Sequence, residues 1–332
     1  MAQADGVSIT VVVDNWVDML LDSSVFPAEP HCAAHRHGLI EHFDPKLAKP
    51  RAEFGLALWV ESWSGNRRTC TLFDCGLTAD VLLHNLALFG LDPGRLDAVV
   101  ISHGHPDHFG GIYELLNAIG RQVPVILHPE AFLPRWAIMG DGGVAAYYNS
   151  ALQVEQLRRS GGSSVLTRDP VTLGQGVTTT GEIPRLTDFE AILPTDPTTD
   201  PGLYRIDDDG RLAPDPVLDE QGLVIDVADV GLIVLTGCAH AGVINTIYRS
   251  RELAPSRPIA AAFGGFHLGF PTTPTENVMK TSAALSELAV GYVMPMHCSG
   301  LRAHANFSTG TQFSYLQPAV GTTVTFGVPQ HE

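Results

Sequence analysis

A dense run of histidine and aspartate constrains the fold of this chain more than any other feature of its sequence. His103, His105, Asp107 and His108 directly follow the apolar run 96–101, which is typical of a buried strand. In extended backbone, residues two apart point to the same side, so His103 and His105 can bind one ion together. Asp107 and His108 lie on the expected turn into a helix and can face the same cavity. Imidazole and carboxylate are standard ligands of zinc and similar ions, so the sequence predicts a metal site at this strand-to-helix junction.

Strands and helices are expected to alternate along much of the chain. Thr78 is placed to cap a helix whose Leu82, Leu86 and Phe89 fall on one face. A second amphipathic helix is expected over residues 109–119, and another after Gly242. Strands are expected at residues 7–13, 54–61, 69–73, 96–101, 123–127, 222–226, 231–236, 259–263 and 292–295, with 222–226 and 231–236 forming a hairpin. This alternation predicts a layered α/β fold.

The composition favours a folded acidic protein. The chain has 332 residues, of which 45% are hydrophobic, and 36 acidic side chains outnumber 20 basic ones to give a formal net charge of -16. Such a field repels nucleic acid and anionic membrane surfaces, so partners of these two kinds are not expected. The five cysteines form no CxxC pair, and the first 21 residues lack the features of a signal peptide, so a cytoplasmic location is expected.

We expect residues 1–332 to form a single domain. The length of the chain would also allow two domains, but α/β folds of this size often form a single domain. The segment at about 27–50 is rich in proline, histidine and charge, which indicates an insertion. The segment at about 134–222 gives weak signals and is expected to be irregular and rich in loops. Within it, residues 196–219 have the composition of a surface loop.

The run His103, His105, Asp107 and His108 matches the HxHxDH hallmark of the metallo-β-lactamase fold superfamily, which this sequence resembles. The resemblance implies a four-layer αββα sandwich, with the metal site at one edge between two sheets. It also implies that the first two histidines serve one metal and that the aspartate and the last histidine serve a second. Asp74 matches an acidic residue that usually contacts these ligands without binding the metal itself. A role in helix capping or in a turn would explain Asp74 equally.

The remaining ligands are expected among three histidines that follow apolar runs late in the chain. His297 is favoured as the last ligand of the second metal, and His240 as the residue that completes the first. His267 is the alternative to His240. A single histidine after a strand is more often a hydrogen-bonded structural residue, but a metal site that needs completing changes this balance. Many members of the superfamily have a bridging aspartate where this chain has Cys238, so it stays open whether Cys238 contacts metal.

Further segments resemble one branch of the superfamily. It is labelled 7,8-dihydropterin-6-methyl-4-(ribofuranosyl)aminobenzene 5'-phosphate synthase-like and comprises metal-dependent hydrolases. The matching segments are Asp14-Asn15, Glu53-Phe54-Gly55-Leu56, Thr180-Gly181-Glu182-Ile183-Pro184-Arg185, Thr236-Gly237-Cys238-Ala239-His240-Ala241-Gly242, Gly264-Gly265-Phe266-His267-Leu268 and His297-Cys298. Hydrolytic dehalogenases of aromatic compounds are also similar to this branch. The resemblance therefore implies the fold and the metal chemistry, but it does not identify the substrate.

The resemblance implies a zinc-dependent hydrolase that uses a metal-activated hydroxide on a small organic molecule, of the phosphoester, ester or aryl halide class. Asp107 would orient the nucleophile or accept its proton, and His267 would protonate the leaving group or hold the developing oxyanion. Glu182 and Arg185 are candidate substrate-binding residues. One or two zinc ions per chain are expected, with iron or manganese as alternatives.

Two other functions fit the same ligands: an iron-dependent oxidoreductase of the dioxygenase kind, and a metal-binding protein without catalysis. The partner is expected to be a small-molecule substrate. A homodimer is common for enzymes of this kind.

Overall fold

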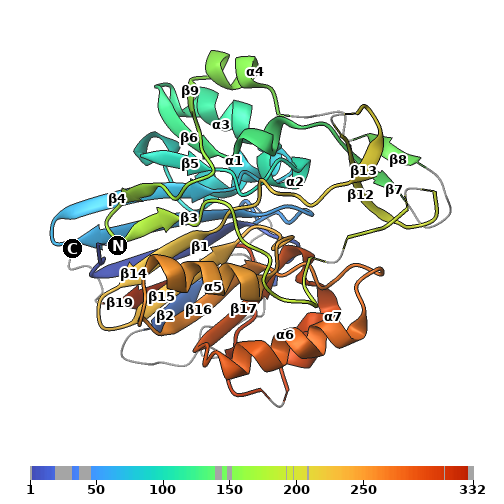
Figure 1. Cartoon of the computed structure of the whole chain (residues 1–332). Helices are drawn as coiled ribbons and strands as arrows, with labels where there is room; N and C mark the ends of the chain where they lie inside the picture. The colour runs from blue at the N-terminus through green and yellow to red at the C-terminus, as the bar shows by residue number, and fades with distance from the viewer. Residues whose placement is uncertain are drawn as a thin grey trace.

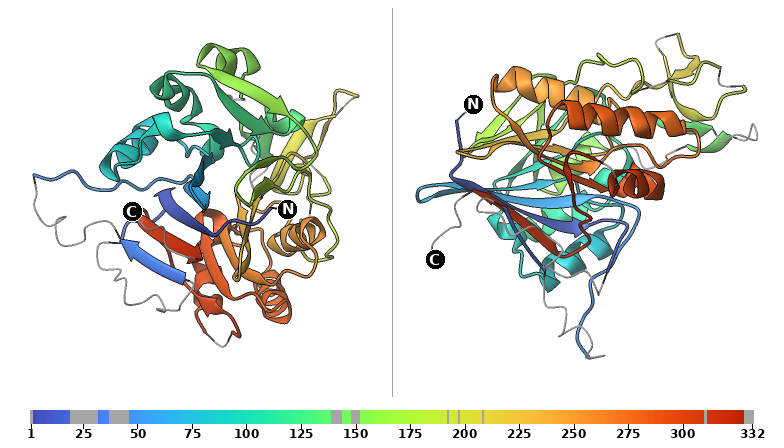
Figure 2. Two further views of the ribbon diagram at one scale, coloured as in Figure 1. Left: turned by 90° about the vertical axis from the view of Figure 1, so that its left-hand side faces the viewer. Right: turned by 90° about the horizontal axis from the view of Figure 1, so that it is seen from below.

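The computed structural model describes residues 2–18, 32–36, 46–138, 144–147, 152–191, 193–196, 198–207, 209–309 and 311–327 (Figure 1). Two large sheets lie face to face, and helices cover the outer face of each. In the right-hand view of Figure 2, the cyan helices lie below the sheets and the orange and red helices lie above them. This arrangement confirms the four-layer αββα sandwich that the resemblance implies.

The first sheet has eight strands in the order β2-β19-β1-β3-β4-β5-β6-β9. Its strands are β1 (Gly6–Val13), β2 (Cys32–Arg36), β3 (Ala57–Ser64), β4 (Arg67–Phe73), β5 (Ala98–Val100), β6 (Val123–Leu127), β9 (Gly162–Leu166) and β19 (Thr322–Gly327). Strands β4, β5, β6 and β9 run parallel to one another. The helices that accompany this sheet are α1 (Ala79–Leu88), α2 (Pro106–Phe109), α3 (Ile112–Ile119) and α4 (Val154–Arg159).

The second sheet has seven strands in the order β10-β11-β14-β15-β16-β17-β18. Its strands are β10 (Thr172–Gly174), β11 (Val177–Thr179), β14 (Leu223–Val227), β15 (Gly231–Thr236), β16 (Ile259–Gly265), β17 (Tyr292–Met296) and β18 (Ser314–Tyr315). Strands β15 to β18 run parallel to one another. Helices α5 (Val243–Leu253), α6 (Thr275–Glu287) and α7 (Gly300–Phe307) accompany this sheet.

Three apolar layers hold the sandwich together, one between the sheets and one under each set of helices. The alternation of side chains along β3 divides that strand between two layers. Leu58 and Val60 face the layer between the sheets, whereas Ala57 and Trp59 face the layer under α1 and α3. Since successive residues of a strand point to opposite faces, a strand with both faces buried must be apolar on both.

Most expected elements are present, with one difference next to the histidine run. The Thr78 side chain caps α1, and β14 and β15 form the predicted antiparallel hairpin. The single helix expected over residues 109–119 is instead two helices, α2 and α3. Gly110 and Gly111 separate them, and a β-carbon on Gly110 would lie 1.9 Å from the Leu77 carbonyl oxygen. Glycine therefore lets the end of α2 pack directly against the backbone that leads into α1.

The segment 196–219 is not the surface loop that its composition suggests. It contains β12 (Gly202–Ile206) and β13 (Leu212–Pro214), which pair with β7 (Arg135–Ile138) and β8 (Val144–Tyr147) in a third sheet. Asp215 and Asp219 are fully buried because both form ion pairs with the buried guanidinium of Arg135. Acidic residues usually indicate a solvated segment, and the composition gave no sign of the distant arginine that stabilises these two carboxylates in the interior.

Two other expectations concern regions that the structure describes in part. Of the predicted insertion at 27–50, only residues 32–36 and 46–50 are described, and residues 32–36 form β2 at the edge of the first sheet. Among the described residues, no helix combines the length and apolar character that a membrane span requires. The single domain and the cytoplasmic location stay predictions.

The contact at Gly110 predicts a steric effect on stability. Gly110 has helical backbone angles that alanine adopts freely, so the cost of Gly110→Ala comes from the clash with Leu77. We expect it to lower the free energy of unfolding by about 3 kcal/mol. The control is Gly120→Ala, where φ is +68° and no atom lies within 4 Å of the added carbon. It should cost about 1–2 kcal/mol through backbone strain alone. Urea unfolding followed by circular dichroism measures both, and equal losses would contradict the close packing at Gly110.

Candidate metal centre

The candidate site lies where strand ends from both sheets meet. Strands β4 and β5 of the first sheet end just before Asp74 and the histidine run. Strands β15, β16 and β17 of the second sheet end just before Cys238, His267 and His297. Because each of these groups of strands runs parallel, their carboxyl ends lie at one edge of their sheet, where α/β proteins commonly bind ligands.

His103, His105 and His240 form a first cluster. One potential ligand atom of each lies within 4.8 Å of the others. Nε2 of His103 is 2.8 Å from Nδ1 of His105, and the His240 ring centroid lies 4.8 and 4.9 Å from those of His103 and His105. The structure therefore brings His240 to the first two histidines of the run, and its role as a metal ligand stays a prediction.

The first cluster is suited to neutral imidazoles. Burial lowers the pKa of His103, His105 and His240 well below the usual histidine value, and neighbouring histidines lower it further. Neutral imidazole is the form that binds metal, so these rings need lose no proton at neutral pH to act as ligands. Nε2 of His240 is buried and, within the described part of the chain, has no hydrogen-bond partner.

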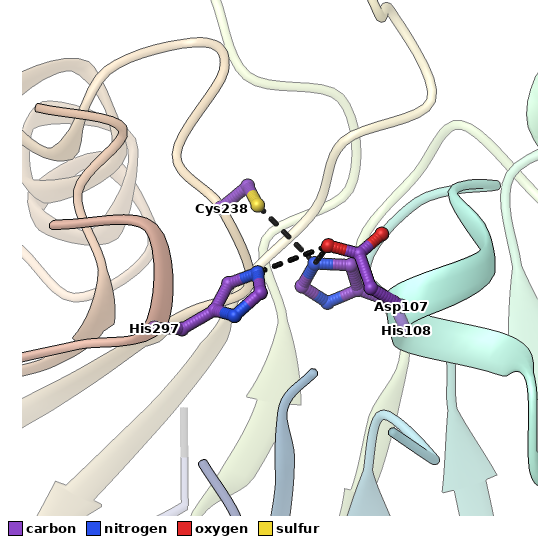
Figure 3. Close-up of side chains that lie close together, drawn as sticks. All are labelled: Asp107, His108, Cys238 and His297. Atoms are coloured by element: carbon purple, nitrogen blue, oxygen red, sulfur yellow. Dashed lines mark hydrogen bonds and ion pairs between the residues drawn. The ribbon is translucent and has the colours of Figure 1, made fainter. Parts of the chain in front are cut away.

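Asp107, His108, Cys238 and His297 form a second cluster, and Figure 3 shows the four side chains pointing toward one another. Oδ2 of Asp107 lies 3.1 Å from Nε2 of His297 and 3.6 Å from Nε2 of His108. The sulfur of Cys238 lies 3.2 Å from the same His108 nitrogen. Helix α2 carries Asp107 and His108, and the 3-10 turn η5 (His297–Ser299) carries His297.

The surroundings of the second cluster favour positive charge. Burial alone would lower the pKa of His108, but the carboxylates of Asp74 and Asp107 outweigh it and raise this pKa to about 9. Burial would raise the pKa of Asp107, but His108 and His297 hold it well below its usual range. Asp107 is therefore ionised at neutral pH, and a buried position beside it stabilises a cation.

The structure bears directly on the open question about Cys238. Its sulfur belongs to the second cluster and also lies within 4.8 Å of ligand atoms of His240 and His267. The thiol therefore stands between the two groups of histidines. Burial raises the pKa of Cys238. A coordinated cation is the usual means of stabilising a thiolate in such surroundings.

His267 lies at the margin of the first cluster. Its ring centroid is 4.2 Å from that of His240 and 4.5 Å from that of Phe270. Its Nδ1 is buried and has no hydrogen-bond partner among the described residues. Its ring also groups with Cys238 and His240 as a possible set of metal ligands, so both roles predicted for His267, ligand and proton donor, stay predictions.

Asp74 has the contacts that a supporting residue requires. Its Oδ2 lies 2.6 Å from Nδ1 of His108 and accepts a 2.7 Å hydrogen bond from the Ser102 hydroxyl, while Oδ1 accepts from the Ser102 N–H. A carboxylate at Nδ1 fixes the proton there and leaves Nε2 free to bind metal. Asp74, His267 and His297 all have positive φ, at 63°, 52° and 46°. Such backbone is uncommon outside glycine and is often found at functional sites.

Sequence reasoning assigned no role to several residues that hold the ligands. Asp14 accepts a 2.8 Å hydrogen bond from the N–H of His297, and Asn15 donates to the His297 carbonyl at 2.9 Å. Glu220 accepts hydrogen bonds from the backbone of His240 and Ala241. Asp14-Asn15 was noted only as part of the family resemblance, and no local signal indicates Glu220.

The candidate substrate-binding residues have other partners. Arg185 donates to the backbone carbonyls of Pro216 and Val217, so its guanidinium joins two segments of chain. Glu182 forms an ion pair with Arg168, which is half exposed. Their substrate-binding roles stay predictions.

The chemistry of the donor set fits a transition metal. Imidazole nitrogens, one thiol and one carboxylate suit zinc and iron better than calcium or magnesium, which prefer oxygen ligands. Nε2 of His240, which is buried and has no hydrogen-bond partner in the described part of the chain, belongs to one of the three histidines of the first cluster. His103, His105 and His240 could hold one ion, and Asp107, His108, Cys238 and His297 a second.

Comparison with known proteins agrees with this geometry. The family model for the metallo-beta-lactamase superfamily matches residues 51–248. The 7,8-dihydropterin-6-methyl-4-(beta-D-ribofuranosyl)-aminobenzene-5'-phosphate synthase of Methanocaldococcus jannaschii is 34% identical over 257 residues, which cover 77% of this chain and 84% of that protein. This similarity confirms the resemblance to that branch.

Solved structures of metallo-beta-lactamase fold proteins are also similar to this chain. A crystal structure of a metal-dependent hydrolase of the beta-lactamase superfamily superposes with a TM-score of 0.65 at 26% identity, covering 96% of this chain and 98% of that one. The metallo-beta-lactamase fold protein YhfI from Bacillus subtilis has a TM-score of 0.50 at 14% identity, with the same coverage, and shows the fold alone. From the matching family model and the synthase of M. jannaschii, we conclude that the chain belongs to the metallo-beta-lactamase superfamily.

Proposed function

We propose that this protein is a metal-dependent hydrolase that binds zinc at the two clusters and acts on a small organic substrate. The observation that carries the proposal is the convergence of three ligand side chains in the first cluster and four in the second at one edge of the sandwich. The candidate substrates are phosphoesters, esters and aryl halides. The name of the M. jannaschii relative refers to a 5'-phosphate, which supports testing phosphoesters first.

Bound zinc would supply Lewis acidity and lower the pKa of water from 15.7 to about 7. The chain would contribute the groups that orient the reactants and move protons. Asp107 is ionised and only partly covered, so its carboxylate can hold or accept a proton at the reacting position. His267 can give a proton to the leaving group from its ring, which borders the first cluster.

The first test is a panel of chromogenic substrates given to the zinc-loaded protein: a phosphate diester, a phosphate monoester, a carboxylic ester and an aryl halide. We expect hydrolysis of one class that continues without oxygen. Oxygen consumption by iron-loaded protein, with no hydrolysis by zinc-loaded protein, would instead support the iron-dependent oxidoreductase.

We predict that Asp107→Asn lowers kcat for the active class by about 100-fold or more, because the amide cannot accept the proton that the carboxylate accepts. Initial rates at saturating zinc measure this effect. Asp80→Asn is the matched control, since Asp80 is an exposed carboxylate on α1 that pairs with Arg51. A wild-type rate for Asp107→Asn would rule out the role given to Asp107.

Asp74→Asn tests the support of His108. Asparagine tolerates the positive φ of this position, so the change removes the carboxylate without a new backbone conflict. We expect zinc binding at the second cluster to weaken by about 10–100-fold, measured by competition with a chelating indicator. Asp97→Asn is the control, because Asp97 accepts a hydrogen bond from the N–H of Cys70 in the middle of β4. Unchanged zinc affinity in Asp74→Asn would contradict the supporting role.

A further inference from the structure

Three consecutive polar residues, Asp219, Glu220 and Gln221, are buried beside the first cluster just before β14. Their exposed fractions are 0%, 2% and 2%. Burying two carboxylates and an amide is costly unless each finds partners, so their partners indicate what the segment is for.

Asp219 binds the first turn of the site. Its Oδ2 accepts a 2.7 Å hydrogen bond from the N–H of Gly104, the residue between His103 and His105. The guanidinium of Arg135 donates to the other carboxylate oxygen and so fixes the direction of the side chain. A β-carbon on Gly104 would lie 2.0 Å from the Ala131 carbonyl oxygen, so this turn is also confined from its other side.

Glu220 binds the second turn, which leaves β15 and carries His240. One carboxylate oxygen accepts from the N–H of His240 at 2.7 Å, and the other accepts from the N–H of Ala241 at 2.5 Å. The turn has left-handed backbone at Ala239, with φ of 56°, so it needs outside contacts to keep its shape. Glu220 satisfies two adjacent backbone donors that would otherwise be buried without partners.

Gln221 joins the same segment to the end of β5. Its backbone N–H donates to the Ser102 carbonyl at 2.9 Å, and its side-chain amide donates to the Ile101 carbonyl at 3.0 Å. The tripeptide therefore contacts the backbone on both sides of His103 and the backbone of His240. These two turns lie more than 130 residues apart in the sequence, at positions 104 and 240.

We propose that Asp219, Glu220 and Gln221, which we call the clasp, are positioning residues for the first cluster. They hold the His103–His105 turn and the His240 turn at the spacing that one metal ion requires. The inference rests on the proposed function, because it assigns the clasp to a metal site.

The contacts of the clasp make the proposal specific to the first cluster. The first cluster consists of imidazoles, whereas the second contains the Asp107 carboxylate. Arg135 pairs with both Asp215 and Asp219, so this group has one carboxylate in excess, and Glu220 adds another acidic group near the first cluster. The clasp reaches the first cluster through the N–H groups of Gly104 and His240, so its effect is expected at that cluster.

The test compares zinc binding by the wild type and by Glu220→Gln. Glutamine keeps the size of the side chain, but its NH2 group cannot accept from a backbone N–H. Competition with a chelating indicator should show two binding steps in the wild type. We expect the step of the first cluster to weaken by about 10–100-fold in the variant and the other step to stay unchanged.

Asp226→Asn is the matched control. Asp226 is also a buried carboxylate, but it lies at the opposite end of β14 and pairs with Arg257 at 2.8 Å. Gln221→Met removes one donor and keeps the length of the side chain. It should weaken the same step by a few-fold, and it replaces Glu220→Gln as the test if that variant does not fold.

Two further readouts separate positioning from a general loss of stability. With cobalt in place of zinc, the thiolate-to-cobalt band from Cys238 should persist in Glu220→Gln, because Cys238 belongs to the second cluster. In chelator-treated protein, hydrogen exchange at the amides of His240 and Ala241 should be faster in Glu220→Gln than in the wild type, with the amides of the preceding strand β15 unchanged.

Equal weakening of both steps, no weakening of either, or the same selective loss in Asp226→Asn would overturn the role of the clasp. A wild-type protein that binds no metal would overturn both the clasp and the proposed function. A wild-type protein that binds zinc in two steps but hydrolyses nothing would overturn the proposed function alone.

Discussion

The face-to-face packing of the two sheets determines where every candidate ligand lies. Each sheet contributes parallel strands whose carboxyl ends reach the same edge, and the apolar layer between the sheets fixes how those edges meet. Asp107 and His108 come from the first sheet's side of this boundary, whereas Cys238 and His297 come from the second. A metal site at this boundary therefore depends on core packing as much as on its own ligands.

The two clusters differ in the charge that they present. The first gathers imidazoles whose pKa values are lowered by burial, and its acidic partners contact backbone N–H groups rather than the rings. The second places an ionised Asp107 directly among the ligands and holds His108 with Asp74. A carboxylate attracts a divalent cation more strongly than neutral imidazole rings do. We therefore expect the two clusters to differ in their affinity for a metal ion.

The parts of the fold that sequence predicts well depend on neighbouring residues. The cap at Thr78, the hairpin of β14 and β15 and the ligand run at His103 need only local patterns. The parts of the fold that the sequence did not predict depend on contacts between residues far apart in the sequence. Arg135 binds Asp215 and Asp219 from 80 and 84 positions away, so an acidic segment was taken for a surface loop.

The same limit applies within the site. The approach of His240 to His103 agrees with the resemblance, because the family pattern includes a completed metal site. Cys238 contacts His108 across 130 residues of sequence, and Glu220 accepts a hydrogen bond from His240 across 20 residues. No motif in the sequence indicates either contact. The division of the expected helix at Gly110 and Gly111 depends on a contact with Leu77, which is distant in the sequence.

Elemental analysis of the purified protein tests the central claim most directly. The account predicts about two zinc ions per chain in the wild type. It predicts about one in His103→Ala, which removes a first-cluster ligand, and about one in His297→Ala, which removes a second-cluster ligand. A wild type that binds no metal after reconstitution, or zinc content that neither variant changes, would contradict it.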